Sequence, residues 1–353
     1  LKPGEKNTLA VRLENLPESS RWYPGAGLYR NVHLIITEDA YIPVWGTYIT
    51  TPSVNEKFAK VNVRTKVVLP EGADPAKYSV ETSVWNPNKQ KLTAVRTSLA
   101  QMKYNNNQAE QEFVIQAPSL WSPEMPALYS AETRLYEGDK LKDIYTTPFG
   151  IRSIEIIPDK GFFLNGKRTV FKGVCNHHDL GPLGAAVNDA AIRRQIRILK
   201  DMGCNAIRTS HNMPAPELIR ACDEMGMMIM AESFDEWNVA KCKNGYNLLF
   251  DEWAEKDLVN LLHNFRNNPS VVMWCIGNEV PNQWNEGDCK IAKWLQDICH
   301  REDPTRPVTQ GMDAPDAVVN NNFAAVMDVA GFNYRPFKYK INYKKLPQRI
   351  VLG

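Results

Sequence analysis

The sequence lacks a long apolar run, a surplus of charge of one sign and a cysteine pair of the metal-binding type. Its 353 residues hold 42 lysines and arginines against 40 aspartates and glutamates, which leaves no basic field for nucleic acid. No apolar stretch approaches the roughly 18 residues that cross a bilayer. The start, Leu1–Lys6, has no apolar core of a signal peptide. We therefore expect neither a nucleic-acid partner nor a membrane partner.

The seven cysteines all lie from residue 175 onward, and no two of them stand in a CxxC pair. Their odd number, in a part of the chain that is large enough to build its own core, argues against a disulfide framework. We expect most of them to be buried as small apolar side chains. This pattern favours a reducing compartment, but a removed N-terminus would also remove an export signal. The choice between cytoplasm and periplasm therefore stays open.

The first half of the chain is predicted to be β-structure, and the length suggests two or three domains. Alternating segments at Val32–Ile36, Ala59–Val67 and Ser79–Trp85 predict strands, with turn clusters rich in proline, glycine and asparagine between them. The spacing over residues 52–152 is typical of one β-sandwich of about 100 residues. Residues 1–51 supply only three or four strands, so we interpret them as the C-terminal part of a further β domain.

Beyond residue 153, short apolar runs alternate with segments of helical period. One such segment, Asp189–Met202, carries Ile192, Ile196 and Leu199 on a single face. Repeated βα units of this kind predict a parallel sheet covered by helices. No glycine-rich phosphate loop of the GxGxxG or Walker type is present.

Polar residues stand at the end of nearly every predicted strand of this half: His177, His178, His211, Glu232, Asn278, Glu279, Gln310 and Tyr334. A (β/α)8 barrel builds its active site at the C-terminal ends of its strands, so we predict such a barrel over residues 153–353. About seven strands are recognisable, the seventh just beginning when the sequence stops at Gly353, whereas a closed barrel needs eight. Both ends of the sequence therefore look cut, and the predicted barrel is incomplete.

Several separated segments carry a family resemblance, namely Arg21–Val32 (RWYPGAGLYRNV), Pro148–Arg152 (PFGIR), Gly173–Asp179 (GVCNHHD), Asn205–Asn212 (NAIRTSHN) and Asn267–Glu279 (NNPSVVMWCIGNE). In this order they resemble glycoside hydrolase family 2, the group of β-galactosidases, β-glucuronidases and β-mannosidases. The resemblance implies a sugar-binding β domain of the jelly-roll type for residues 1–51. It implies an immunoglobulin-like sandwich for 52–152 and a catalytic barrel for 153–353.

The resemblance also implies roles at the site, residue by residue. Glu279 would be the general acid/base, and Asn278 would bind the sugar 2-hydroxyl. His177 and His211 would line the subsite of the non-reducing sugar, and Tyr334 would hydrogen-bond the nucleophile. Retaining glycosidases need two carboxyl groups about 5–5.5 Å apart, one to protonate the leaving oxygen and one to attack the anomeric carbon.

Two further carboxylates carry alternatives. Glu232 is either a substrate ligand or a structural carboxylate that orients Arg208. Glu236 resembles a metal-binding carboxylate of some β-galactosidases, which would admit Mg²⁺ or Na⁺, yet Asn238 stands where those enzymes have a histidine. The reaction itself requires no cofactor.

Some other residues also carry alternatives. Trp237 and Trp284 are either sugar-stacking platforms or packed aromatics, and His177 and His211 are either substrate ligands or core histidines. Arg21 is either in contact with the barrel or exposed to solvent, and the exposed alternative is favoured here.

The nucleophile is expected outside this sequence. In the family a glutamate follows the seventh strand, which Arg349–Gly353 resembles, so we expect the nucleophile beyond Gly353 and predict that this chain alone is inactive. The favoured function is cleavage of terminal β-galactosides from oligosaccharides or glycans by a bacterial-type enzyme. β-Glucuronidase and then β-mannosidase are the alternatives within the family, and a non-catalytic carbohydrate-binding protein is the alternative of another class. Carbohydrate is the expected partner, and a homo-oligomer is left open.

Overall fold

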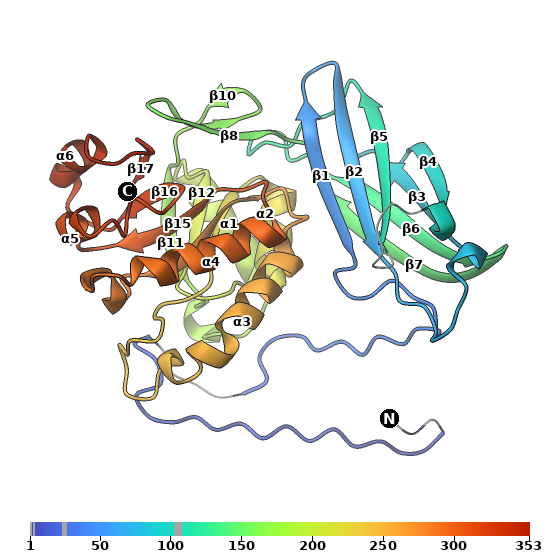
Figure 1. Ribbon diagram of the computed structural model, residues 1–353, viewed down its shortest axis with the longest axis horizontal. Coiled ribbons are helices and arrows are strands. Elements are labelled where there is room, and N and C mark those ends of the chain that lie inside the picture. Colours follow the sequence, from blue (N-terminus) through green and yellow to red (C-terminus); the bar gives the residue numbers. More distant parts are fainter. Residues whose placement is uncertain (1, 3, 23–26, 102–107) are drawn as a thin grey trace.

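The computed structural model describes residue 2 and residues 4–22, 27–101 and 108–353. Figure 1 shows two folded units side by side, a β-sandwich and an α/β unit, and a long N-terminal segment that runs past both. Tyr23–Ala26, in the middle of the motif RWYPGAGLYRNV, lie outside the described residues.

The N-terminal segment contains no strand before Thr47 in the part of the chain that the structure describes, apart from an isolated bridge between Tyr41 and Val68. The prediction of a strand at Val32–Ile36 is therefore wrong. A strand needs a neighbour to share its hydrogen bonds, and no strand of the described residues pairs with this segment. Its side chains are exposed, with 85% of the Ile36 surface accessible.

The sandwich is confirmed as two antiparallel sheets. One has the order β1-β2-β5 and the other β4-β3-β6-β7. The bounds are β1 Thr47–Val54, β2 Phe58–Lys66, β3 Tyr78–Trp85, β4 Lys91–Ser98, β5 Gln108–Gln116, β6 Tyr129–Glu137 and β7 Lys140–Phe149, with short 3-10 turns η1 Pro75–Lys77 and η2 Leu99–Gln101. Alternate residues of β2, among them Val61 and Val63, are fully buried between the sheets. Because β1 begins at Thr47, the predicted boundary between residues 51 and 52 falls inside a strand.

A small antiparallel sheet joins the sandwich to the α/β unit. Its strands are β8 Ile154–Ile157, β9 Gly161–Leu164 and β10 Lys167–Arg168. Phe162 and Leu164 of this sheet pack against Trp121, Met228 and Val272, which closes the N-terminal end of the parallel strands with apolar side chains.

The α/β unit is an incomplete (β/α)8 barrel, as predicted. Seven parallel strands follow one another in chain order: β11 Gly173–His177, β12 Ala206–Ser210, β13 Met228–Glu232, β14 Val271–Asn278, β15 Val308–Met312, β16 Val329–Phe332 and β17 Val351–Leu352. Each pairs only with its neighbours in that order, so β11 and β17 are the two edges among the described strands. A barrel of eight strands would place one more between these edges.

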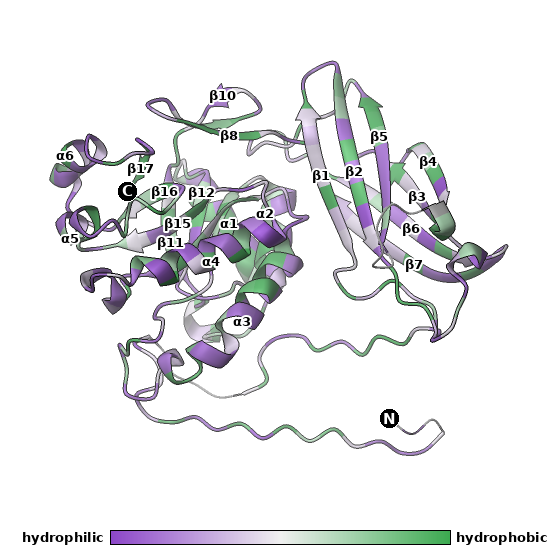
Figure 2. Cartoon of the chain, viewed as in Figure 1, coloured by the Kyte–Doolittle hydropathy of each residue, from purple (hydrophilic) through white to green (hydrophobic). Residues whose placement is uncertain are grey.

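The helices that cover this sheet are α1 Asp189–Asp201, α2 Pro216–Met225, α3 Phe250–Phe265, α4 Cys289–Glu302, α5 Pro315–Asn320 and α6 Tyr339–Tyr343, with 3-10 turns η3 Gly181–Leu183, η4 Tyr246–Leu248, η5 Pro281–Trp284 and η6 Pro336–Lys338. The predicted stripe of Ile192, Ile196 and Leu199 on α1 is buried. Figure 2 shows hydrophilic and hydrophobic residues alternating along α3 and α4, as amphipathic helices require. Within the described ranges, no helix has both the length and the apolar character needed to span a bilayer.

Buried polar contacts hold the sandwich against the barrel. The Tyr48 hydroxyl of β1 donates to Asp303 Oδ1 at 2.8 Å, just after α4. Arg152, 7% exposed, donates to the carbonyl oxygens of Pro269 and Val271 at 2.6 and 2.7 Å. These bonds are satisfied only when the two units are docked, so they fix their relative position.

Candidate active site

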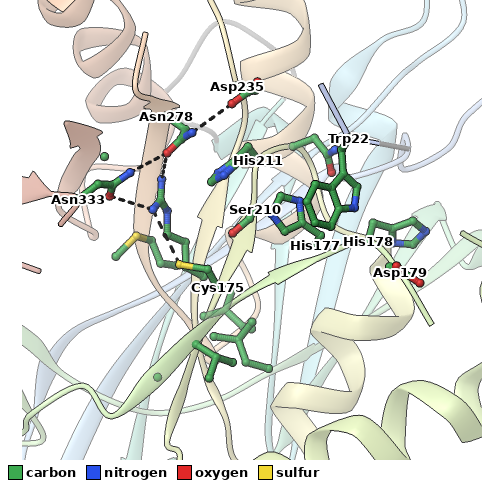
Figure 3. A pocket seen from close by; sticks show the side chains of 18 of the residues that line it. Trp22, Cys175, His177, His178, Asp179, Ser210, His211, Asp235, Asn278 and Asn333 are labelled. Carbon is green, nitrogen blue, oxygen red and sulfur yellow. Dashed lines mark hydrogen bonds between the residues drawn. The ribbon is translucent and has the colours of Figure 1, made fainter. Parts of the chain in front are cut away.

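A cavity of about 1550 Å³ opens at the C-terminal ends of the barrel strands. Side chains from β11, β12 and the segments after β13, β14 and β16 line it, together with Arg21 and Trp22 from the N-terminal segment. Figure 3 shows several of these side chains converging on one space. The predicted gathering of polar strand ends at one edge is therefore present.

Glu279 stands at the centre of this arrangement. It follows β14 directly, with a φ of 45°, a conformation uncommon for any residue other than glycine. Its backbone N–H donates to the Gly311 carbonyl at 2.7 Å, which ties it to β15. Asn333 Nδ2 donates to Glu279 Oε1 at 2.8 Å, so a neighbour from the segment after β16 orients the carboxyl group.

The Asn278 side chain is fixed at both ends of its amide. Oδ1 accepts hydrogen bonds from Arg208 Nη2 and from Asn333 Nδ2, both at 2.9 Å. Nδ2 donates to Asp235 Oδ1 at 3.1 Å. The two donors on one side and the carboxylate on the other leave only one orientation of the amide (Figure 3).

Glu232 lies beneath the cavity and does not line it. The residue is fully buried, and its two oxygens hold Arg208 Nε and His211 Nδ1. Burial alone would lower the pKa of Arg208, but the charge of Glu232 outweighs it and raises that pKa. Burial and the charge of Glu232 raise the pKa of Cys275, whose thiol donates to the carboxylate at 2.8 Å. The structure thus favours the structural alternative for Glu232 over direct contact with substrate.

The two predicted histidines form one wall of the cavity. The rings of His177 and His211 meet edge to face with centroids 5.1 Å apart, and Trp22 stacks on His177 at 3.7 Å (Figure 3). Burial, and then the neighbouring His211, lower the pKa of His177, which favours a neutral ring. His178 lies further out, where its Nε2 contacts the Ala185 carbonyl at 2.8 Å.

Tyr334 lies at the rim, 70% exposed, two residues after β16. The nearby negative charge of Glu279 raises the pKa of its phenol. Gln310, in contrast, shares its face of β15 with Val308 and Met312, which belong to the core against the helices. Gln310 is nevertheless among the residues that line the cavity, and it is fully buried.

Arg21 contacts the barrel, and its side chain is still 43% exposed, so both predicted alternatives apply to it. Its Nε and Nη2 donate to the two oxygens of Asp235 at 2.9 and 2.7 Å, a bidentate pair. Lys241 Nζ also donates to Asp235, at 3.0 Å. Sequence reasoning missed Asp235 and Asn333 as members of the site. Asp235 and Asn333 come shortly after the ends of β13 and β16, and that position was the available signal.

Both carboxylate oxygens of Glu236, the predicted metal ligand, accept backbone N–H groups. Its Oε2 accepts the N–H of Lys241 at 2.6 Å and its Oε1 that of Asn247 at 3.1 Å, so both oxygens fix the loop before η4. Asn238 Oδ1 accepts from Asn282 at 2.9 Å. Among the described residues, no three histidine, cysteine, aspartate or glutamate side chains are grouped as metal ligands would be.

The two tryptophans differ in their surroundings. Trp237 is fully buried and donates to the Ile276 carbonyl at 2.9 Å, so it is a packed aromatic. Trp284, at the end of η5, is 61% exposed.

Two domain models of the same family match the chain. "Glycosyl hydrolases family 2, TIM barrel domain" matches residues 155–345, and "Glycosyl hydrolases family 2" matches residues 41–152. The chain belongs to glycoside hydrolase family 2. The second match begins at residue 41, consistent with the start of the sandwich before the predicted boundary at 52.

Relatives within family 2 include both galactosidases and glucuronidases. The chain is 40% identical to "Beta-galactosidase BoGH2A" of Bacteroides ovatus, over 95% of its own length and 43% of that protein. It is 31% identical to a "Beta-glucuronidase" of Bacteroides fragilis, over 88% of its length and 46% of that protein. A crystal structure of a family 2 member from Bacteroides cellulosilyticus has a TM-score of 0.87 at 37% identity, covering 94% of this chain and 43% of the other. The chain thus spans less than half the length of these relatives.

Proposed function

We propose that the protein is a retaining β-glycosidase that removes terminal β-galactosyl residues from oligosaccharides or glycans. The observation that carries the proposal is the cluster of Asn278, Glu279 and Asn333 at the C-terminal mouth of a family 2 barrel. This cluster presents one carboxyl group, held by an amide, beside a second amide whose orientation is determined.

In the proposed reaction Glu279 is the general acid and then the general base. Asn333 donates to Oε1, which leaves Oε2 as the oxygen that carries the proton to the leaving group. Glu279 must be protonated for the first step and must lose its proton in that step, so that it can activate water in the second. Asn278 is suited to bind the sugar 2-hydroxyl, a contact that strengthens as the oxocarbenium-like transition state forms.

We place the nucleophile outside residues 1–353. Among the described residues that line the cavity, the carboxylates besides Glu279 are Asp179 and Asp235. Asp179 accepts the N–H of Gly181 at 2.7 Å and orders the loop after β11. Asp235 is neutralised by Arg21 and Lys241, which makes it a poor nucleophile. The chain of 353 residues is therefore proposed to be inactive alone.

Galactose is favoured over glucuronate by the charges in the cavity. A uronic acid carries a carboxylate that needs a cation for recognition. Within the described lining the cationic side chains are Arg21 and Arg208, and each is already paired, with Asp235 and Glu232. The higher identity to the galactosidase relative than to the glucuronidase, 40% against 31%, points the same way.

The proposal requires no metal ion or other cofactor. Glutamate, asparagine and a second carboxylate supply the proton transfers and the nucleophile that the reaction needs. The predicted Mg²⁺ or Na⁺ site at Glu236 takes no part in the proposed reaction.

Hydrolysis of nitrophenyl β-galactoside, β-glucuronide and β-mannoside tests the function. The full-length gene product and the chain of residues 1–353, each of confirmed mass, are assayed side by side. We expect the full-length protein to act best on the galactoside and the shorter chain to be silent on all three. If the full-length protein prefers another glycoside, the specificity is for that sugar and not for galactose. Turnover by the shorter chain would show that the nucleophile lies within residues 1–353. A full-length protein that binds galactose without hydrolysing any substrate would be the non-catalytic alternative.

A further inference from the structure

The N-terminal segment is anchored to the barrel at two places, one on each side of Arg21 along the chain. Residues 17–22 and 27–31 are here called the strap. The Glu18 carbonyl accepts the N–H of Asn244 at 3.0 Å, in the loop after β13. At the other end, Arg30 donates to the Met213 carbonyl at 2.7 Å, after β12. Figure 1 shows this part of the chain, in blue, at the edge of the barrel and far from the sandwich.

Between these anchors, Arg21 of the strap contacts Asp235. Asp235 Oδ1 accepts from three donors, Arg21 at 2.7 Å, Lys241 at 3.0 Å and Asn278 at 3.1 Å, and Oδ2 accepts from Arg21 at 2.9 Å. Burial alone would raise the pKa of Asp235, but Arg21 and Lys241 hold it well below its usual range. The group is therefore anionic at all working pH values, and its side chain is 28% exposed.

The amide of Asn278 has only one hydrogen left to offer. Its Oδ1 is occupied by Arg208 and Asn333, and one of the two Nδ2 hydrogens points to Asp235. A primary amide carries two N–H donors, so a single N–H remains for a ligand in the cavity. Asn278 can thus act on substrate as a donor, and Asp235 determines the direction in which it donates.

We propose that Asp235, held by Arg21 of the strap, is a positioning residue that aims the remaining N–H of Asn278 at the oxygen of the sugar 2-hydroxyl. This inference rests on the proposed function, because it assumes a glycoside in the cavity. It makes the N-terminal segment a working part of a site whose reacting groups all belong to the barrel.

Hydrogen bonds connect Arg21 to Asp235 and Asp235 to Asn278. Arg21 and Asp235 form a bidentate pair, which restricts both side chains more than a single contact would. Lys241 also donates to the Asn278 carbonyl at 2.6 Å, so the backbone and the side chain of Asn278 are tied to the same cluster. A misplaced amide would lose a contact that strengthens in the transition state, so the loss falls on kcat more than on KM.

The test compares two substrates in the full-length protein, nitrophenyl β-galactoside and its 2-deoxy analogue. For Asp235→Ala we expect kcat/KM to fall about 10- to 100-fold on the galactoside and less than about 3-fold on the 2-deoxy substrate. The double variant Asp235→Ala/Asn278→Ala should match Asn278→Ala alone within about 2-fold, because both changes remove the same contact.

Two further variants separate positioning from folding. Asp235→Asn keeps the size of the side chain and an oxygen that can accept from Asn278, so its loss should be intermediate and again confined to the galactoside. Arg21→Met should resemble it. Asn31→Ala is the matched control, since it removes a 2.6 Å hydrogen bond between the strap and Glu217 that lies outside this chain of contacts. This variant should leave kcat/KM unchanged on both substrates.

Equal losses on the two substrates would overturn the inference, and so would additive effects in the double variant. Either result would mean that Asp235 contacts the sugar directly or supports the site in general. The failure of the proposed function looks different, because the unmodified full-length protein would then hydrolyse none of the glycosides.

Discussion

At the residue scale, Glu279 owes its setting to neighbours from two other strands. Its N–H is bound by Gly311 of β15, and its carboxyl group receives Asn333 from the segment after β16. Adding a Cβ to Gly311 would place it 2.5 Å from Arg208 Nη2. The absence of a side chain at this position lets the guanidinium reach Asn278.

Replacement of Glu279 by alanine should lower kcat/KM by an amount that depends on the leaving group of the substrate. In the full-length protein we expect kcat/KM on a disaccharide or alkyl galactoside to fall about 10²- to 10⁴-fold, because its leaving oxygen must be protonated. A dinitrophenyl galactoside, whose leaving group needs no proton, should lose much less in the first step. Added azide should restore turnover by replacing the water that Glu279 activates.

The control for this prediction is Glu286→Ala, at an exposed glutamate before α4, which should behave as the parent protein. Equal losses on the activated and the poor leaving group would remove Glu279 from the acid/base role.

At the scale of elements, helices α1 and α2 end in glycines of different surroundings. Gly203 follows α1 with a φ of 88° and no atom near its Cβ position, whereas Gly226 ends α2 with a φ of 73° and lies against the sandwich side of the molecule. A Cβ on Gly226 would stand 2.3 Å from the Pro123 carbonyl oxygen. One glycine is therefore required by backbone conformation alone, and the other also by close packing.

Alanine at these two positions should have unequal effects on stability. Gly203→Ala should cost about 1 kcal/mol, the penalty of a left-handed conformation for a residue with a Cβ. Gly226→Ala should cost about 2–4 kcal/mol, because the new methyl group also displaces a backbone carbonyl. Thermal melting of the full-length protein, followed by tryptophan fluorescence, measures both, and equal shifts would contradict the packing argument.

On helix α4, His300 contacts Asp328, the residue just before β16, and this contact raises the pKa of the histidine. His300 Nε2 lies 2.7 Å from Asp328 Oδ2, which also accepts the N–H of Val308 at 2.8 Å. The hydrogen bond to Asp328 raises the pKa of His300 above 6.5. A raised pKa means that the contribution to stability is fully present below the unfolded value and is lost as the pH rises through the folded value.

The difference in melting temperature between the parent protein and His300→Gln should therefore be larger at pH 6 than at pH 8. His263→Gln is the comparison, since burial lowers the pKa of His263 despite its contact with Glu302. The difference in melting temperature between the parent protein and His263→Gln should therefore be smaller at pH 6 than at pH 8. A His300→Gln difference that is constant over this range would show that the charged form gains nothing from Asp328.

At the scale of the whole molecule, a buried ionic cluster connects the sandwich and the barrel. Asp303 is fully buried and receives Tyr48 from β1, Arg306 at 2.6 Å and Trp274 Nε1 at 3.0 Å. The Tyr48 ring also lies against Arg266, 4.5 Å from the guanidinium carbon. A carboxylate buried in this way depends on every partner, including the one from the other unit.

Tyr48→Phe should destabilise the protein by about 1–2 kcal/mol, because it removes one donor from a buried carboxylate and leaves the packing intact. At about 2–4 °C per kcal/mol the melting temperature should fall measurably. Tyr78→Phe is the matched control, since the Tyr78 hydroxyl contacts Glu137 at 3.3 Å within the sandwich only. If Tyr48→Phe lowers the melting temperature no more than Tyr78→Phe does, the hydrogen bond between the two units adds nothing special to stability.

The local sequence pattern was enough to predict most of the helices and strands. The helical period of α1, the alternation of β2 and the continuous burial of β14 are each written in about ten neighbouring residues, and each element is present. Val32–Ile36 has the same local pattern as β2 and is not a strand. Propensity describes what a segment can do, but a strand exists only where a partner supplies the second half of its hydrogen bonds.

The sequence by itself determined the family, the barrel and the place of Asn278 and Glu279, because these depend on short motifs and on their order. The tertiary structure alone decided that Arg21 contacts Asp235, 214 positions away, and that Glu232 lies below the cavity. Pairing over such a distance depends on how the loops at one end of a barrel approach each other and the N-terminal segment. No periodicity or spacing along the chain records that approach, since it is set by the packing of the strands beneath.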